Sequence, residues 1–410
     1  MKNYTPYLQW IDQQEGKILT VLEKWVNTNS GTGNVKGINA MISSLEEAFA
    51  TLNGTMVRVS LPPKKRINSL GTIVEEAVGD ALVISKRPEA PLQIILAGHM
   101  DTVYAPDSLF QKMEKINSEL IRGPGVADMK GGLAIMLTAL QAIERSPYAD
   151  QIGWDVVINP EEEIGSPCSE RLFIEKARNK QLGLVFEPAY MDGAIVSQRK
   201  GSFNFTVVST GKAAHAGRDF HLGRNAITAL AKFILKAEAL NDLQRGITVN
   251  IGHIEGGKAT NIVPDLAICR CNVRMVNPQD LTIIKEQLQS IVDEQNDNTG
   301  SALEFFEESE RGPKPFDAQH EKLFESLKEC ADELDISLTW KPSGGVCDGN
   351  IIAAEGIPTV DTLGAVGENI HTFDECARID SLTSRAKLTA LFLMKLANNE
   401  ISIKELGRVT

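Results

Sequence analysis

The sequence lacks any apolar run long enough to cross a membrane. Its longest apolar stretches, such as Leu92–Gly98 and Leu391–Ala397, fall far short of the roughly 20 residues that a spanning helix needs. The segment Met1–Gly16 contains Asp12 and Glu15 rather than the apolar stretch of about 7–15 residues that a secretory signal requires. These absences predict a cytoplasmic protein without a membrane partner. The alternative is a periplasmic protein whose signal has been removed.

Cysteine is scarce, and positive charge is in deficit. The six cysteines form no C-x-x-C pair, and Cys269 and Cys271 share one face of a predicted strand, too local a pair for a useful disulfide. We therefore expect buried, reduced thiols in a reducing compartment. The 42 Lys and Arg residues face 54 Asp and Glu residues, which gives a formal net charge of −12. That balance argues against a nucleic-acid partner.

The order of predicted elements indicates two domains, as a chain of 410 residues exceeds the roughly 250–300 residues of a single core. Strands alternate with helices up to residue 197 and again from residue 312, the pattern of an α/β domain with a mixed, largely parallel sheet. Residues 198–311 show alternating apolar strands and two helices, which predicts an inserted antiparallel α+β domain. A linker is expected at Glu308–Pro315. The predicted strands are Met56–Leu61, Leu82–Lys86, Leu92–Ala97, Trp154–Ile158, Leu182–Phe186, Ser202–Ser209, Ile247–His253, Leu266–Met275 and Leu303–Glu307. The predicted helical segments are Gly16–Asn53, Leu133–Arg145, Ser169–Ala177, Asn225–Leu240 and Gln279–Asp293.

Imidazole and carboxylate groups follow several of these strands. His99 and Asp101 come directly after a buried strand and, two residues apart, face the same way. Asp128 lies between two glycine pairs, the acidic run Glu161–Glu163 follows another strand, and Glu187 ends a third. Ligands in such sheets bind beyond the carboxyl ends of the strands, and zinc accepts this set of donors. Together the residues indicate a metal site, although each alone is as consistent with a solvated turn.

The surrounding motifs resemble those of the metallopeptidase family of aminoacylase, acetylornithine deacetylase, succinyl-diaminopimelate desuccinylase and glutamate carboxypeptidase. The resemblance covers about residues 16–400, with the motifs in the same order. The motifs are Gly98-His-Met-Asp-Thr, Gly125-Val-Ala-Asp-Met-Lys-Gly-Gly, Asn159-Pro-Glu-Glu-Glu-Ile-Gly-Ser, Phe186-Glu-Pro, Gly211-Lys-Ala-Ala-His-Ala-Gly, Gly257-Lys-Ala-Thr-Asn-Ile-Val-Pro, Gly344-Gly-Val-Cys-Asp-Gly and Glu368-Asn-Ile-His-Thr-Phe-Asp-Glu.

The resemblance implies a zinc-peptidase-like catalytic domain that holds two zinc ions, with cobalt or manganese as substitutes. His99 and Glu187 would bind one ion, Glu163 and His371 the other, and Asp128 both. Asp101 would orient His99, and Glu162 would act as general base on a water shared by the metals. The first residue of the acidic triplet, commonly Asp in the family, is Glu161 here. It is not a ligand, so the departure puts little in doubt.

The resemblance also assigns residues of the inserted domain, which would serve as a lid and dimerisation domain. His215 would stabilise the oxyanion in the neighbouring subunit of a homodimer, although a structural turn histidine is the alternative. Asn261 and Arg274 would grip the substrate carboxylate, since the arginine fork suits a carboxylate. A surface ion pair is the alternative for Arg274. Gly345 would let the backbone approach the substrate closely. The other histidines are left as structural residues: His221, His253 and His320.

The expected activity is hydrolysis of an amide or peptide bond in a small substrate with a free carboxylate, such as an N-acyl amino acid or a dipeptide. Zinc carries out no redox chemistry, which favours hydrolysis. A biosynthetic deacetylase or desuccinylase is the second possibility, and an aminopeptidase fits less well because Arg274 favours a carboxylate near the scissile bond. A catalytically silent metal-binding protein is a remote alternative, because Glu162 and all five ligand positions are filled.

Overall fold

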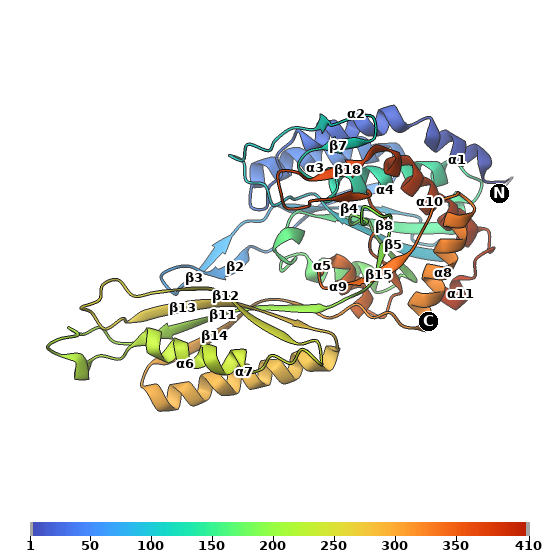
Figure 1. Cartoon of the computed structure of the whole chain (residues 1–410). Coiled ribbons are helices and arrows are strands. Elements are labelled where there is room, and N and C mark those ends of the chain that lie inside the picture. The colour runs from blue at the N-terminus through green and yellow to red at the C-terminus, as the bar shows by residue number, and fades with distance from the viewer. Residues whose placement is uncertain (1–2, 407–410) are drawn as a thin grey trace.

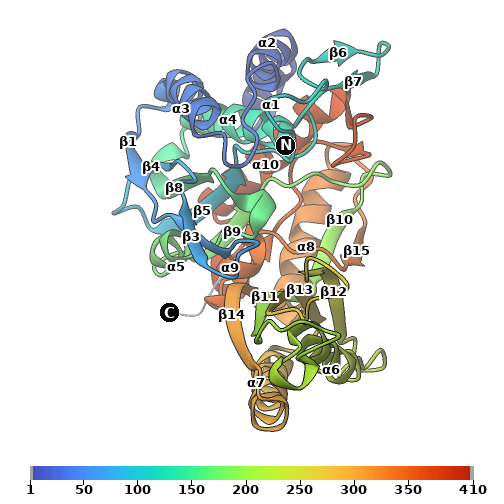
Figure 2. The same cartoon turned by 90° about the vertical axis from the view of Figure 1, so that its left-hand side faces the viewer.

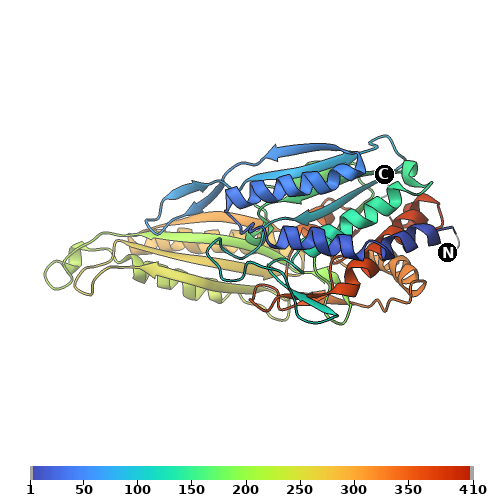
Figure 3. The ribbon, with the colours of Figure 1, turned by 90° about the horizontal axis from the view of Figure 1, so that it is seen from above.

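The chain forms two lobes of unequal size. The computed structural model describes residues 3–406, with the side chains of residues 297–299 left out. Figure 1 shows a large lobe, which contains the first and last helices of the described chain, and a small lobe of strands and helices beside it. Seen from above, the two lobes give the molecule an elongated outline (Figure 3). The small lobe spans residues 201–311, and two chain crossovers connect it to the large one.

A six-stranded sheet forms the centre of the large lobe. Its order is β1-β4-β8-β5-β9-β16. The first three strands pair antiparallel, and β8, β5, β9 and β16 pair parallel, which confirms the predicted mixed, largely parallel α/β sheet. The strand bounds are β1 (Thr55–Ser60), β4 (Asp80–Lys86), β5 (Leu92–His99), β8 (Ile152–Asn159), β9 (Leu182–Val185) and β16 (Thr359–Val360).

Helices cover both faces of this sheet because β5 is apolar on both sides. Ile94 and Leu96 point into the larger core, and Ile95 and Ala97 point into a second core on the opposite face, as strand geometry requires. The larger core takes in α1 (Thr5–Asp12), α2 (Glu15–Val26), α3 (Val35–Phe49), α4 (Lys130–Glu144), α8 (Ala318–Asp332) and α10 (Ile379–Ala397). The opposite core takes in α5 (Glu170–Ala177) and α9 (Asp348–Ala354).

The small lobe is an antiparallel sheet with both of its helices on one face (Figure 2). Its strand order is β12-β13-β11-β14. Phe203 and Phe205 of β11 point into its core, while Ser202 and Asn204, on the other face, hydrogen-bond to polar neighbours. The bounds are β11 (Gly201–Thr210), α6 (Ala226–Glu238), β12 (Thr248–Gly256), β13 (Leu266–Met275), α7 (Pro278–Thr299) and β14 (Ala302–Arg311).

The structure corrects the linker that was predicted at the second crossover. Residues 308–311, expected in a linker, continue strand β14 to Arg311. The predicted domain boundary after residue 197 falls inside β10 (Ile195–Arg199), which pairs parallel with β15 (Trp340–Ser343) of the large lobe.

A hairpin missed by the sequence reasoning joins the lobes a third time. It consists of β2 (Lys64–Ile67) and β3 (Ile73–Glu76), and its Ile67 packs with Val208 and Ile268 of the small sheet. Further elements are β6 (Glu114–Lys115), β7 (Leu120–Arg122), β17 (Gly367–Glu368) and β18 (Cys376–Arg378), which form one sheet, and α11 (Ile403–Leu406). Short 3-10 helices cover Ala50–Leu52, Ala149–Gln151, Glu162–Ile164 and Phe220–Leu222.

Two absences expected from the sequence have structural counterparts within residues 3–406. No helix in this range is long and apolar enough to cross a membrane. All six cysteines are free and buried, and Cys269 and Cys271 lie on the same face of β13 with their sulfurs 3.7 Å apart.

Phe205→Ala should destabilise the small lobe. The Phe205 ring is fully buried and lies 5.4 Å from the ring of Phe203 and 4.9 Å from that of Phe305, centroid to centroid. Removal of a buried phenylalanine ring costs about 3–5 kcal/mol. Urea unfolding followed by circular dichroism measures the change. Leu235→Ala on α6, where the side chain is 68% exposed, is the control and should shift stability by about 0.5 kcal/mol or less. Equal midpoints for the two variants would contradict the assigned core.

Candidate active site

Three neighbouring parallel strands end at the same edge of the large sheet, and each delivers a donor group there. His99 is the last residue of β5 and pairs in register with Asn159, the last residue of β8. The acidic run Glu161–Glu163 follows β8, and Glu187 lies two residues beyond β9. The sheet register therefore gathers these side chains at the edge where α/β sheets bind ligands.

A glycine-rich loop brings Asp128 to this edge. The loop leads into α4, and Gly132 in the first turn of that helix lies against the carbonyl oxygen of Phe186, so closely that a Cβ would lie 1.9 Å from that oxygen. Glycine at this position therefore lets α4 approach the end of β9. The peptide bond between Asp128 and Met129 is cis.

Glu375 accepts hydrogen bonds from the backbone of the same loop. Its buried carboxylate accepts the backbone N–H groups of Gly125, Ala127 and Asp128 at 3.0–3.1 Å. It also accepts the hydroxyl of Tyr104 at 2.9 Å. Burial raises the pKa of Glu375 to about 7. Because Glu375 follows His371 by four residues, it connects the Asp128 loop to the His371 loop.

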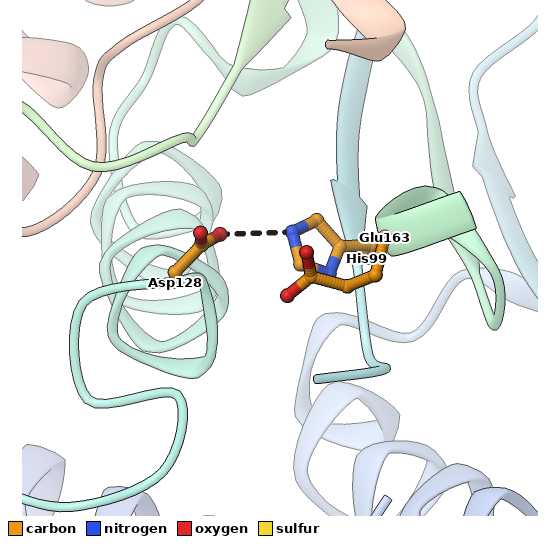
Figure 4. Close-up of side chains that lie close together, drawn as sticks. All are labelled: His99, Asp128 and Glu163. Carbon is orange, nitrogen blue, oxygen red and sulfur yellow. Dashed lines mark hydrogen bonds and ion pairs between the residues drawn. The ribbon is translucent and has the colours of Figure 1, made fainter. Parts of the chain in front are cut away.

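Asp128 stands between two histidines. Its Oδ1 lies 3.1 Å from His99 Nε2, and its Oδ2 lies 3.2 Å from His371 Nε2. Glu163 Oε2 is 3.1 Å from His371 Nε2, and Glu187 Oε1 is 3.9 Å from His99 Nε2. Figure 4 shows Asp128, His99 and Glu163 converging from three separate segments. His371 adopts φ +64, a left-handed conformation that is uncommon for a non-glycine residue.

Asp101 supports the cluster from a fully buried position. Its carboxylate accepts the hydroxyl of Thr32 and the backbone N–H groups of Glu162 and Glu163. His99 Nδ1 lies 3.1 Å from the Asp101 carbonyl oxygen and 3.3 Å from its Oδ1. A proton on Nδ1 satisfies these acceptors and leaves the lone pair of Nε2 directed at Asp128.

The spacing of the donors fits divalent metal ions. Two ligands about 2.0 Å from one tetrahedral zinc ion lie about 3.3 Å from each other. That value is close to the 3.1–3.2 Å between Asp128 and the two histidines and to the 3.1 Å between Glu163 and His371. Among the described residues, two groups have ligand atoms that all lie within 4.8 Å of one another inside the group. One group is His99, Asp128 and Glu163, and the other is His99, Glu162 and Glu187. The carboxylate of Asp128 presents one oxygen to each histidine, as a ligand shared by two ions would.

The ionisation of the cluster also favours bound cations. Burial raises the pKa of Glu163 to about 8, and the Asp128 carboxylate adds to the rise. Hydrogen bonds to Asp128 and Glu163 raise the pKa of His371 to about 10. Burial likewise raises the pKa of Glu187. These groups hold protons tightly because negative charge is crowded where water is scarce, and a cation relieves the same crowding.

Glu162 differs from the other acids because an arginine holds it. Arg311 Nη1 donates to Glu162 Oε1 at 2.8 Å. Burial raises the pKa of Glu162 to about 7, although Arg311 acts in the opposite direction. Because Arg311 engages one oxygen of this carboxylate, Glu162 is less suited than Glu163 to serve as a metal ligand.

A cavity of about 690 Å³ opens beside the cluster. Asp128, Glu162, Glu163, Glu187 and His371 line it together with residues from β10 and from β15 and the loop after it, which include Arg199, Lys341, Ser343 and Gly345. The Arg199 side chain is 9% exposed, and its Nε donates to Asp361 Oδ2 at 2.7 Å. Burial acts against the charge, but Asp361 holds the pKa of Arg199 above its usual range. The cavity therefore combines an acidic cluster with a buried guanidinium.

The remaining predicted residues fall into two groups. Gly345 lines the cavity. His215, Asn261 and Arg274 lie in the small lobe, outside the residues that line the cavity. His215 Nδ1 accepts two backbone N–H groups of its own turn, and the adjacent Ala216 N–H donates to the Asn261 carbonyl. Arg274 Nε donates to Asn272 on the same strand, and its buried Nη1 has no hydrogen-bond partner among the residues that the structure describes. Their roles stay predictions.

The sequence reasoning missed three residues of the site: Arg199, Arg311 and Glu375. Glu375 stands within the motif around His371, so an acidic residue next to a ligand was an available signal. Arg199 and Arg311 lie beside the crossovers, far along the chain from the motifs. Only the three-dimensional arrangement brings Arg199 near Glu187 and Arg311 near Glu162.

Comparisons with known proteins agree with this geometry. The profile of the family described as Peptidase family M20/M25/M40 matches residues 95–395. The chain is 28% identical to carboxypeptidase G2 from a Pseudomonas species over 394 residues, which cover 94% of this chain and 90% of that protein. It is 27% identical to a succinyl-diaminopimelate desuccinylase from Nitrosospira multiformis over 77% of this chain and 86% of the relative.

A solved structure shares the fold. A metallo-carboxypeptidase of the M20 family from Sulfolobus solfataricus superposes with a TM-score of 0.72 at 18% identity, over 93% of this chain and 99% of that one. At this identity the likeness concerns the fold alone.

Protein purified without chelator should contain about two zinc ions per chain. The ligands predicted from the sequence form two sets, His99 with Glu187 and Glu163 with His371, and both sets adjoin the Asp128 carboxylate. Asp128→Asn should lower occupancy of both positions, whereas His371→Ala should lower the content to about one ion. Elemental analysis measures the content. His253→Ala, on β12 beside Arg270, is the control and should keep the wild-type content. A single ion in the wild type, or calcium alone, would rule out the five-ligand assignment.

Proposed function

The chain belongs to peptidase family M20/M25/M40, and we propose that it hydrolyses an amide or peptide bond in a small substrate that carries a free carboxylate. N-acyl amino acids and dipeptides are the substrates of choice. The observation that carries the proposal is that Glu162, four of the predicted metal ligands and buried Arg199 line one cavity.

Five residues of this chain would hold the metal ions. His99 and Glu187 would bind one zinc ion, Glu163 and His371 a second, and Asp128 both, with cobalt or manganese as substitutes. Zinc at these positions would act as a Lewis acid toward the scissile carbonyl and would make a water molecule more acidic. The separations of 3.1–3.2 Å from Asp128 to the two histidines and of 3.1 Å from Glu163 to His371 support this assignment.

Glu162 is the proposed general base. Arg311 engages Oε1, and we assign proton transfer to Oε2, on a side chain that lines the cavity. In this role Oε2 accepts a proton from the attacking water and later returns it to the leaving amine. Asp101 holds the backbone of Glu162 and Glu163 through two N–H groups, so the base and the neighbouring ligand keep a fixed spacing.

Glu162→Gln should lower kcat about 100-fold or more while folding and metal content stay at wild-type values, since a positioned base contributes about 10²–10⁴-fold. Amine release from a dipeptide or an N-acyl amino acid measures the rate. Glu46→Gln, a surface carboxylate also bound by an arginine, is the matched control. Near wild-type turnover by the Glu162→Gln variant would place the base elsewhere.

Arg199 supports recognition of an anionic substrate. The buried carboxylate of Asp361 faces two buried cations, because Lys314 Nζ lies 3.4 Å from the oxygen that Arg199 also engages. Lys314 is fixed by the carbonyls of Ser197 and Thr359, whereas Arg199 reaches the cavity. Positive charge thus exceeds negative charge in this trio, and a substrate carboxylate in the cavity would complete it.

Arg199→Met should raise KM for a substrate with a free carboxylate about 10–100-fold, because a hydrogen-bonded charge contributes about 1.5–3 kcal/mol. KM for the same substrate with its carboxylate converted to an amide should change little. Asp361 keeps Lys314 as a partner, so the variant should fold. Arg274→Ala, measured in parallel, tests the residue that the sequence favoured for the same role. Equal losses on both substrates for either variant would make that arginine structural.

Two further points stay within the proposal. A biosynthetic deacetylase or desuccinylase would use the same residues, and the similarity to a desuccinylase favours it as the second candidate; succinylated and dipeptide substrates assayed side by side separate the two. His215 lies outside the cavity lining of its own chain, which is consistent with a homodimer in which it serves the neighbouring site.

A further inference from the structure

Arg311 belongs to one lobe by its backbone and to the other by its side chain. It is the last residue of β14 and pairs with Ser202 of β11 in the small sheet. Its side chain is 3% exposed, and its guanidinium partners belong to the large lobe. Nη1 donates to Glu162 Oε1 at 2.8 Å, and Nη2 donates to Asp348 Oδ1 at 2.8 Å and to Ser166 Oγ at 2.7 Å.

The residues around Asp348 fix this guanidinium against the large lobe. Asp348 is buried at the start of α9 and accepts the hydroxyl of Ser166 at 2.6 Å. Asn350, in the same first turn, donates to the carbonyls of Lys200 and Gly312 at 3.0 and 2.8 Å. Those two carbonyls belong to the two crossovers between the lobes. The first turn of α9 therefore anchors both crossovers and one nitrogen of Arg311.

A planar guanidinium transmits this anchoring to Glu162. The two terminal nitrogens of arginine are rigidly connected, so once Nη2 is bound to Asp348 and Ser166, the direction of Nη1 is determined. Nη1 in turn fixes Oε1 of Glu162. A lysine ammonium at this position keeps the charge but lacks the rigid fork, and it cannot hold two carboxylates with the same geometry.

We propose that Arg311 is the positioning residue for Glu162, and that the position of β14 relative to the large lobe thereby determines the orientation of the Glu162 carboxylate. The inference rests on the proposed function, in which Glu162 moves the proton. Arg311 acts only through Glu162, since its bonds run to that side chain, Ser166 and Asp348. A shift of the small lobe relative to the large lobe would move β14 and, with it, the Arg311 guanidinium that orients the Glu162 carboxylate.

Charge neutralisation alone is the competing explanation. One guanidinium faces two buried carboxylates, so its deletion leaves both acids unpaired, which is strongly destabilising for a buried pair. Arg311→Lys therefore tests the geometry while the charge stays. The double variant Arg311→Met with Asp348→Asn removes the second acid together with the guanidinium, so that a folded protein without the fork can also be assayed.

For Arg311→Lys we expect kcat to fall about 10–100-fold, because a misplacement of about 1 Å in a reacting group can cost that much. KM, zinc content and the thermal midpoint should stay near wild type, a split that a merely structural role would not produce. The double variant should show a similar loss of kcat. Arg87→Lys is the matched control with full activity: Arg87 also bridges two acids, Glu144 and Asp150, at the opposite edge of the sheet.

Glu162→Gln, assayed on the same substrate, separates the two levels of inference. If Glu162→Gln loses activity but Arg311→Lys retains wild-type kcat, the positioning role is overturned and the proposed function stands. If zinc content falls together with kcat in Arg311→Lys, the residue serves site assembly and the inference is likewise overturned. Wild-type turnover by Glu162→Gln would overturn the proposed function itself.

Discussion

The hydrogen-bond register between β5 and its parallel neighbours β8 and β9 determines where the donor groups emerge. In-register parallel strands end at one level, so His99 and the acidic run after β8 lie side by side without any long-range adjustment. The close approach of α4 at Gly132 then adds Asp128 from the same edge. The His371 loop reaches the site from outside these strand ends, and Glu375 connects it to the Asp128 loop.

The cluster shows how a protein can keep acids crowded where water is scarce. Asp101 is stabilised by two N–H groups and a hydroxyl, Glu375 by three N–H groups and a hydroxyl, and Glu162 by a guanidinium. The acids assigned to metal ions, Asp128, Glu163 and Glu187, have imidazoles as their neighbours instead. The hydrogen-bond partners thus separate the supporting acids from those that remain open to a cation.

Much of the fold was predictable because β5 is a nearly continuous apolar run, the small-lobe strands carry apolar alternation, and the ends of the strands carry unusual residues. The convergence of His99, Asp128, Glu163 and His371 could be predicted because the motifs around them resemble the metal-binding motifs of one metallopeptidase family. Arg311 could not, since it lies in a segment expected to be a linker, and its role depends on partners 149 and 37 residues away in the chain. The hairpin β2–β3 was missed because its strands are short, partly exposed and rich in charge, so they show no apolar alternation.

The small lobe is inserted in the chain between β10 and α8 of the large lobe, and this insertion affects how the chain can fold. The large lobe is assembled from two segments that the small lobe separates, and closing a disordered loop of that length costs about 4 kcal/mol by the (3/2)RT ln n relation. Gly201 begins β11 and Arg311 ends β14, and Ser202, next to Gly201, pairs with Arg311. Once that sheet has formed, the two segments start a single strand spacing apart, about 4.8 Å. Early folding of the small lobe therefore removes most of the chain entropy that opposes the joining of α8 and α10 to the first half of the large lobe.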